Sequence, residues 1–555
     1  MENNGKSSNS AGSGSKLRAP LFEYPALPRW EFATYFLVLV GTLVYAWQRI
    51  FAASRTYEWN SFGLYESYQD VTLDGTTYRK DATDIEWAFW CTYIRKVLPW
   101  MAGHALLFNL SELVLPRQIW KPFMLAYWLF AHVYVTNRKV IGMALVEGLV
   151  IYSMARLTRS KALTWIIGMA LLYVSSATDL FVTYDIDGYG YYVVAIIFPY
   201  KTVQYLTFVT EMMNSHQCSG QVRQDTKEND TPCPPRPKWP VSFLGGLYDM
   251  FWYAFYLPYS CHMIVTYKRF PLQLEARSSM ARNWSEILIY GFRILFWYGL
   301  ANFMLYACYF GAMMNNSQYL NSIPEDTLVS IGYACGQFFH LKYVVIFGTC
   351  AFFARLDKMQ PFSAPICITR VALYSKMWRR FDHGLYDFFK EYIFLPICRP
   401  TFSIPRKIFG VLISYSFVLV WHGTSHQYLV WIILNISELF IETFAKVLYT
   451  IPAIRQVREQ HISDRNLRRT LACLQIVPFA FGLYSNFYFL GTSESGYVFV
   501  DRIFWQETVP VKWPFILLIC LGYCYCHVCM QVDRWQGQKT RKTDIDEEKR
   551  GKKEE

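Results

Sequence analysis

Hydrophobic residues fill long stretches of this chain, and short clusters of charged residues separate them. A helix needs about 17 to 25 mostly apolar residues to cross the hydrocarbon core of a bilayer. Segments that approach this length lie near residues 33–52, 97–114, 121–136, 139–156, 162–182, 191–211, 241–266, 286–313, 327–354, 405–421, 427–447, 469–491 and 512–531. Several are short or contain Pro, Lys or His, so we expect some to be re-entrant. The pattern predicts an all-α polytopic membrane protein with about ten to thirteen hydrophobic segments.

The composition agrees with this class. Hydrophobic residues make up 53% of the 555 residues and charged residues only 17%, which excludes an ordinary soluble protein. The net charge of +12 gathers at segment boundaries such as Arg95-Lys96 and Lys376 to Arg380. Basic residues at such places set the topology of membrane segments and face anionic lipids. The charge therefore indicates membrane lipids as partners and predicts no binding of nucleic acid.

Polar sequence marks the borders of the membrane domain. Residues 1–26 are rich in Ser, Gly and Asn and predict a disordered N-terminal tail. Residues 27–531 form the membrane domain, which a polar loop at 214–240 interrupts. Cys218 and Cys233 in this loop either pair, if the loop faces the lumen, or remain free thiols.

A charged tail, residues 532–555, ends in Lys552-Lys553-Glu554-Glu555. The two lysines resemble the dilysine signal that returns membrane proteins to the endoplasmic reticulum and is read on the cytosolic side. This predicts a multi-pass protein of the endoplasmic reticulum membrane, or of the Golgi, with a cytosolic C-terminus. A charged terminus that is simply solvated is the competing interpretation.

Fourteen cysteines lie mainly in apolar segments, where a thiol behaves as a small hydrophobe. The densest group contains Cys520, Cys524, Cys526 and Cys529, with His527 among them. A structural zinc site needs ligand pairs that one predicted membrane helix does not offer. Palmitoylation of a thiol at the membrane boundary is the favoured interpretation.

A long uncharged stretch in the C-terminal half contains His422. No Lys, Arg, Asp or Glu occurs between Lys407 and Glu438, and Trp421-His422-Gly423 stands in this stretch. An imidazole at bilayer depth is costly, so it is retained mainly where it faces a cavity or takes part in chemistry. We expect His422 to be a general base with Asp382 supplied by a neighbouring segment; a core histidine bonded to a carbonyl is the alternative. His426, one turn later, is expected to be structural.

Short motifs follow one another in a fixed order along the chain. They are Leu27-Pro28-Arg29-Trp30-Glu31, Lys80 to Trp87, Lys342-Tyr343, Arg355-Leu356-Asp357, Lys376 to Leu385, Phe417 to Gly423, Ser485-Asn486 and Asp501 to Phe504. Together they resemble the membrane-bound O-acyltransferase superfamily, and within it the hedgehog-acyltransferase branch of protein-cysteine N-palmitoyltransferases. The resemblance implies the fold of this superfamily, with a catalytic region at 364–491.

The resemblance implies a role for each matching residue. His422 corresponds to the catalytic histidine of the superfamily and Asp382 to its second signature residue. Trp378 and Arg379 correspond to substrate-binding residues that shape the reaction chamber. Asn486 corresponds to an asparagine beside the acyl thioester, where an amide can steady an oxyanion.

The resemblance also implies a cofactor and reveals one departure. Cys367 corresponds to a cysteine that ligates the iron of a structural haem b in the mammalian enzyme; without the resemblance it would be interpreted as a buried thiol. After Tyr256-Leu257-Pro258 the family usually has Gly-Pro, whereas this chain has Cys261-His262-Met263-Ile264. The departure puts the acyl-chain preference in question more than the reaction type.

The implied function is the transfer of palmitate from palmitoyl-CoA to the N-terminal cysteine of a secreted signalling protein of hedgehog type. The donor would arrive from the cytosol and the acceptor from the lumen. Two alternatives stay open: an O-acyltransferase that modifies a lipid or serine hydroxyl, and a catalytically silent regulator with the same fold. The presence of both His422 and Asp382 argues against the silent regulator.

Overall fold

The computed structural model describes residues 24–59, 68–177, 188–221, 242–260, 262–505 and 513–554. The predicted N-terminal tail lies outside this part of the chain up to residue 23, and so does the predicted loop beyond residue 221, including Cys233. The final helix runs to Glu554, although the side chains of Lys552 and Lys553 lie outside the described residues.

Helices form almost all of the described chain. They are α1 (Arg29–Thr56), α2 (Ile85–Val114), α3 (Arg117–Val135), α4 (Arg138–Thr158), α5 (Lys161–Ala177), α7 (Gly188–Gln221), α8 (Phe243–Ala254), α9 (Phe270–Ala276), α10 (Trp284–Ala307), α11 (Phe310–Met314), α12 (Ser317–Ser322), α13 (Glu325–Leu356), α14 (Tyr374–Phe381), α15 (His383–Phe388), α16 (Leu395–Cys398), α17 (Ile404–His422), α18 (His426–Thr450), α19 (Pro452–His461), α20 (Asp464–Leu490), α21 (Ser493–Val500) and α22 (Trp513–Glu554). Short 3-10 or π turns include η1 (Leu257–Tyr259), η3 (Ile368–Arg370) and η4 (Phe389–Phe394).

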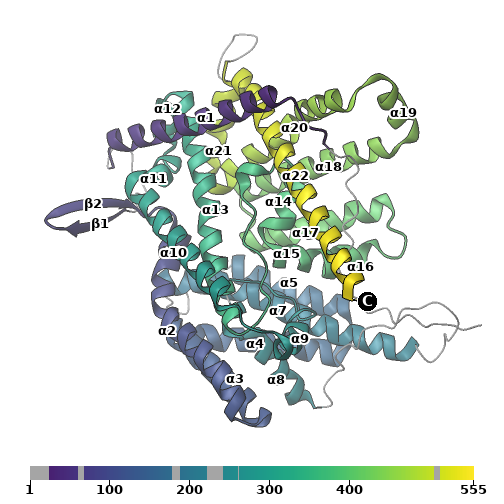
Figure 1. The fold of residues 1–555 in the computed structure, drawn as a ribbon. Helices are drawn as coiled ribbons and strands as arrows, with labels where there is room; N and C mark the ends of the chain where they lie inside the picture. The colour runs from purple at the N-terminus through teal and green to yellow at the C-terminus, as the bar shows by residue number, and fades with distance from the viewer. Residues whose placement is uncertain are drawn as a thin grey trace, which may run out of the picture.

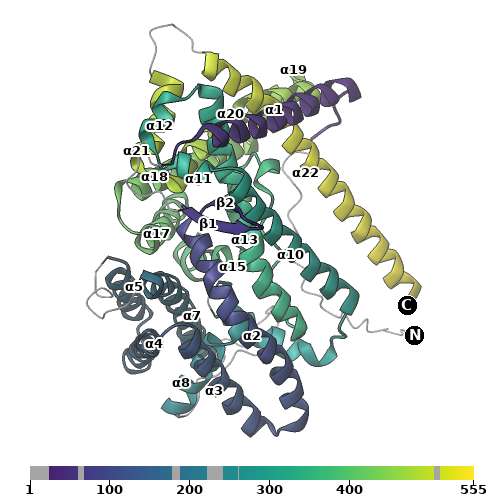
Figure 2. The same cartoon turned by 90° about the vertical axis from the view of Figure 1, so that its left-hand side faces the viewer.

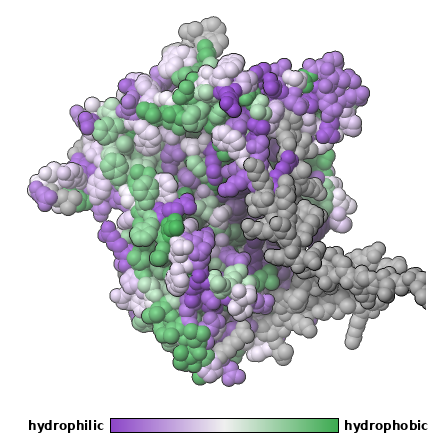
Figure 3. Space-filling model, in the orientation of Figure 1, coloured by the Kyte–Doolittle hydropathy of each residue, from purple (hydrophilic) through white to green (hydrophobic). Residues whose placement is uncertain are grey.

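The membrane prediction is confirmed. Within the described residues, nine helices are long and apolar enough to cross a bilayer, and the apolar part of α5 is a shorter one. Large apolar side chains point outward from these helices; on α10, for example, Phe292 is 70% exposed and Phe296 63% exposed. Figure 3 shows hydrophobic side chains spread over the outer face, while hydrophilic ones cover the region of α19. Outward apolar side chains of this kind are what hydrocarbon chains of lipid would cover.

One small sheet interrupts the helical fold. Strand β1 (Tyr68–Leu73) pairs antiparallel with β2 (Thr76–Asp81), and the hairpin projects from the left side of the molecule in Figure 1. Asp74 and Gly75 form its turn with φ of 50° and 78°, the left-handed conformation that two-residue hairpin turns require. The prediction of an all-helical chain overlooked this hairpin, although Asp-Gly is a common signal for one.

Helix α13 is the centre of the arrangement. Both views show α2, α3, α4, α7 and α8 in a lower group and α1, α20 and α21 in an upper one, with α13 running between them (Figures 1 and 2). In the most apolar 18-residue stretch of α13, 67% of the residues are buried inside the protein. The helix packs against α1, α2, α10 and α20. Helix α13 therefore serves as the support on which both groups are placed.

The predicted segment at 241–266 does not cross the membrane as one helix. Helix α8 ends at Ala254, and the following chain is buried but largely non-helical. Lys201 of α7 donates hydrogen bonds to the carbonyl oxygens of Ala254 and Ser260, the latter at 2.9 Å, and Gln204 Nε2 donates to the Tyr259 carbonyl at 3.0 Å. Non-helical backbone inside a membrane protein is stable only when protein groups satisfy it in this way. The sequence led us to expect some interrupted segments without naming them, and the structure shows that this is one.

A buried polar network ties the lower group to α13. His104 Nε2 lies 2.7 Å from Asp357 Oδ2, and Trp128 Nε1 donates to His104 Nδ1 at 2.8 Å. Because Nδ1 accepts, the ring proton is on Nε2 and is donated to the carboxylate. Tyr256 Oη and Asn109 Nδ2 donate to the same carboxylate at 2.6 and 3.0 Å. Asp357 thus accepts from two donors of α2 and from one donor in the chain that follows α8.

We predict that Asp357→Ala strongly destabilises the protein. The change leaves the buried donors of His104 and Tyr256 without an acceptor, so the free energy of unfolding should fall by about 3 kcal/mol or more. Thermal unfolding in detergent, followed by tryptophan fluorescence, measures the loss. Asp70→Ala, which removes an exposed ion pair with Arg79 on the hairpin, is the control and should leave the melting temperature nearly unchanged. Equal melting temperatures for both variants would contradict the structural role of Asp357.

Candidate functional site

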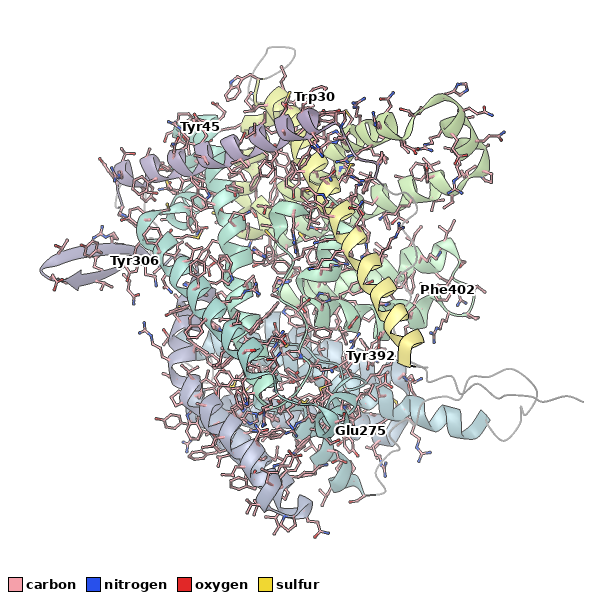
Figure 4. The ribbon with its side chains drawn as sticks, viewed as in Figure 1. Trp30, Tyr45, Glu275, Tyr306, Tyr392 and Phe402 are labelled. Atoms are coloured by element: carbon pink, nitrogen blue, oxygen red, sulfur yellow. The ribbon has the colours of Figure 1, made fainter. Side chains whose placement is uncertain are left out.

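A cavity of about 1650 Å³ runs through the membrane domain, and its wall is mostly apolar. Helices α1, α13, α14, α17, α18, α20 and α22 all contribute to the wall. Tyr45, which Figure 4 labels on α1 at the top of the molecule, lines one part of it, and Lys407 near the start of α17 lines another. The five polar residues predicted for the reaction chamber line this same cavity: Trp378, Arg379, Asp382, His422 and Asn486. The fold thereby places residues as far apart in the chain as Trp378 and Asn486 on the wall of one cavity.

His422 is the last residue of α17, and its side chain is accessible from the cavity. The rings of Tyr428, Trp431 and Phe489 surround it, with centroids 5.8, 5.4 and 5.4 Å away. Gly423 follows with φ of +99°, a conformation that side-chain-bearing residues rarely adopt, and ends the helix. His426, predicted to be structural, is exposed at the start of α18 and does not line the cavity.

Asp382 lies between α14 and α15 and caps the latter. Its Oδ1 accepts the backbone N–H of Leu385 at 2.9 Å. Burial raises the pKa of the Asp382 carboxyl to about 6, although hydrogen bonds from the backbone N–H groups of Leu385 and Gly384 oppose the shift. Among the described residues, no hydrogen bond joins Asp382 to His422. The two side chains face one cavity but do not form a bonded dyad.

A glycine allows the segment after Asp382 to approach the buried chain that follows α8. A Cβ atom at Gly384 would lie 1.9 Å from the carbonyl oxygen of Ile264, so no larger residue fits. Ile264 belongs to a buried cluster with Phe388 and with Tyr392, which Figure 4 labels deep in the molecule. This close contact fixes where α15 begins and therefore where Asp382 stands.

The polar face of α18 holds α14 in place. Trp431, Asn435, Glu438 and Glu442 recur at helical spacing and are buried. Asn435 Oδ1 accepts the indole N–H of Trp378 at 3.1 Å. Glu442 accepts the backbone N–H of Ser375 at 3.3 Å, at the start of a helix that has no side-chain cap of its own.

Sequence reasoning missed the residues of this polar face. Glu438 and Glu442 stand inside a predicted hydrophobic segment, and an ionisable residue at membrane depth is by default a candidate for function. That signal could have singled them out. The partners of Asn435 and Glu442 on α14 could not have been named, because those partners lie more than fifty positions away in the chain.

Asn486 of α20 also contacts α14. Its Nδ2 donates to Tyr374 Oη at 2.7 Å, and both residues line the cavity. The carboxamide carries two N–H bonds, and Tyr374 takes one of them. The second is available to an acceptor in the cavity.

Exposed cationic side chains from three elements line the cavity. Arg379 of α14, Lys390 of η4 and Lys407 of α17 line the cavity and are exposed. Among the described residues, no carboxylate forms an ion pair with any of these three side chains. Lys407 lies fifteen residues before His422 on α17, about 22 Å along the helix axis. A ligand with phosphates at one end and a reactive group at the other would match this separation.

Cys367 does not line the cavity, but its neighbours Ile368 and Thr369 do. The thiol is half-buried, and its Sγ lies 2.9 Å from Thr369 Oγ1. Leu39 and Leu43 of α1 line the same cavity as Ile368 and Thr369.

The cysteine-rich part of α22 shows no metal site. Cys520, Cys524, Cys526 and Cys529 are free thiols. Within the described ranges, no group of three or more His, Cys, Asp or Glu side chains could hold a metal ion. Cys218 lies outside the residues whose side chains are described.

Known proteins resemble the chain over most of its length. The profile of the membrane-bound O-acyltransferase family matches residues 35–485. The chain is 26% identical over 516 residues to protein-cysteine N-palmitoyltransferase HHAT of Mus musculus, covering 90% of this chain and 98% of that protein. It is 31% identical over 287 residues to protein-cysteine N-palmitoyltransferase Rasp of Drosophila melanogaster, covering 51% and 55%. It is also 24% identical over 526 residues to the HHAT-like protein of Mus musculus, covering 92% and 95%.

Proposed function

The chain belongs to the membrane-bound O-acyltransferase family, and on this premise we propose that it moves palmitate from palmitoyl-CoA to the N-terminal cysteine of a secreted protein of hedgehog type. Acyltransferases of this family use acyl-CoA donors. The observation that carries the proposal is the position of His422, whose imidazole is open to a largely apolar cavity that also contains Asp382 and Asn486.

The proposed reaction is an aminolysis of a thioester. The free amine of the acceptor cysteine attacks the palmitoyl carbonyl, so that a C–N bond forms and the C–S bond to coenzyme A breaks. His422 takes the proton from the attacking amine, because an imidazole is a base near neutral pH, and returns it to the departing thiolate. The second N–H of Asn486 steadies the negative charge on the carbonyl oxygen. Asp382 holds the turn into α15 and orients the acceptor.

The cationic part of the wall supports a coenzyme A donor. Arg379, Lys390 and Lys407 offer positive charge to the donor's phosphates, and the apolar wall accommodates the hydrocarbon chain. In this arrangement the phosphates stay at the exposed edge while the thioester reaches His422. Trp378 and Arg379 are then contacts of the donor at the entrance to the chamber.

The acceptor is proposed by analogy with the relatives. Their names describe protein-cysteine N-palmitoyltransferases, at 26% and 31% identity. A hydroxyl acceptor, in a lipid or a serine, is the competing possibility within the same family. We also propose that the protein resides in the membrane of the endoplasmic reticulum or the Golgi. A further part of the proposal is that Cys367 binds the iron of haem b.

We predict that His422→Ala lowers palmitoyl transfer by about 100-fold or more, the usual effect of losing a general base. The assay combines purified protein in detergent, labelled palmitoyl-CoA and peptides that begin with Cys, Ser or acetylated Cys. Only the free N-terminal Cys peptide should be labelled. His426→Ala, one turn away and outside the cavity wall, is the matched control and should keep most of the activity. A folded His422→Ala protein with near-normal turnover would refute the base.

A second prediction concerns haem. A thiolate bound to haem iron has a characteristic visible spectrum, so protein purified from cells supplied with haem should be coloured. Cys367→Ala should lose or shift this absorption, whereas Cys473→Ala, which changes an exposed thiol on α20, should not. Colourless protein with full activity would show that haem is not bound.

A third prediction concerns topology. A tag placed after Glu555 should be cut by protease in sealed microsomes, because a dilysine signal is read in the cytosol. Replacing Lys552 and Lys553 by Ser should allow part of the protein to leave the endoplasmic reticulum, as followed by fluorescence microscopy. Protection of the tag would place the tail in the lumen and exclude the retrieval signal.

A further inference from the structure

The imidazole of His262 is buried in the cavity wall, and one of its two nitrogens has no hydrogen-bond partner among the described residues. The residue follows η1, is 8% exposed and lines the cavity. Its Nε2 finds no hydrogen-bond acceptor or donor among the described residues. Leaving such an atom unpaired is costly, so the arrangement indicates that something in the cavity normally contacts it.

Other buried histidines show what an ordinary structural role looks like. Both ring nitrogens of His104 are hydrogen-bonded, to Asp357 and Trp128. Both nitrogens of His132 are bonded as well, to the Trp128 carbonyl at 2.6 Å and to Ser260 Oγ at 2.8 Å. His527 lacks partners too, but it packs between two tyrosine rings and does not line the cavity.

The surroundings of His262 are apolar. Its ring lies 5.5 Å from the ring of Tyr93 and 6.5 Å from that of Tyr200. Ile196, Leu385, Phe389 and Trp421 line the same cavity from α7, α15, η4 and α17. Tyr200 in turn packs against Trp421, at 5.4 Å between centroids, and Trp421 precedes His422. This arm of the cavity therefore starts beside His422 and has the shape and polarity of a pocket for a hydrocarbon chain.

The backbone around His262 is held from both sides. Lys201 and Gln204 bind the carbonyl oxygens of Ser260 and Tyr259 just before it. Just after it, Ile264 lies against Gly384, where no side chain would fit. The imidazole is thus presented at a fixed place rather than on a movable loop.

We propose that His262 is the polar floor of the acyl-chain pocket and limits the length of the fatty acyl chain that the protein accepts. The proposal rests on the acyl transfer proposed above and names the group that selects the donor. Each methylene buried in an apolar pocket improves affinity about fourfold. A methylene pressed against the unpaired Nε2 loses this gain, because it excludes the water that would otherwise bond to the nitrogen. Affinity should therefore rise with chain length only until the chain end reaches His262.

The test measures binding without catalysis. In the His422→Ala background, lauroyl-, myristoyl-, palmitoyl- and stearoyl-CoA compete with labelled palmitoyl-CoA, with His262 unchanged or replaced. With His262 present, affinity should stop rising along the series. His262→Leu, which is apolar and of similar size, should restore the gain of about fourfold per methylene beyond that break. His262→Gln keeps a polar group and should keep the break.

The outcomes are separable. If affinity stops rising at the same acyl-chain length in His262→Leu as in the protein with His262, the proposal is overturned. A shift in His262→Gln equal to that in His262→Leu overturns it as well, because the ring would then act by its shape rather than its polarity. Failure of every protein to bind palmitoyl-CoA would instead refute the proposed donor. Unfolded variants are recognised by thermal melting, and His262→Asn provides a smaller polar replacement.

Discussion

The contact between the polar face of α18 and the start of α14 is the interaction on which the site depends. A helix end that is surrounded by apolar material cannot leave its N–H groups unbonded, and α14 brings no cap of its own. Glu442 of α18 accepts the N–H of Ser375 at the start of α14, and Asn435 of the same helix accepts the indole N–H of Trp378. Because α14 leads directly into Asp382, these contacts determine where its carboxylate meets the cavity. Glu442 is thus a buried carboxylate in a membrane helix whose hydrogen bonds to Ser375 hold the start of α14.

The protein contains two His and Asp combinations with opposite properties. His104 and Asp357 are hydrogen-bonded to each other, fully buried and satisfied by further donors, so nothing is left for a ligand to bind. His422 and Asp382 line one cavity and are not hydrogen-bonded to each other, so both are open to a ligand in that cavity. Complete satisfaction of polar groups stabilises a fold, whereas accessible polar groups serve chemistry.

The cavity has a mostly apolar wall with a few polar groups on it. Arg379, Lys390 and Lys407, His422 at the end of α17, and His262 all line it. Apolar surface binds any hydrocarbon chain in proportion to its length. Only polar groups at fixed positions can set where the chain begins and ends. Cationic residues together with an apolar wall fit the proposed donor, which has a phosphate-rich head and a long hydrocarbon tail.

The sequence by itself determined the membrane class, most of the helices and the candidates His422 and Asp382. Span length and the cost of an intramembrane charge are local properties, and a stretch of some twenty residues contains them entirely. Only the tertiary structure decided that the segment at 241–266 is interrupted and that Asn435 and Glu442 hold α14. It also decided that the Nε2 atom of His262 has no hydrogen-bond partner among the described residues, while both ring nitrogens of His104 have one. Those facts depend on contacts such as Trp378 with Asn435, 57 positions apart, and neither composition nor periodicity specifies which distant residues meet.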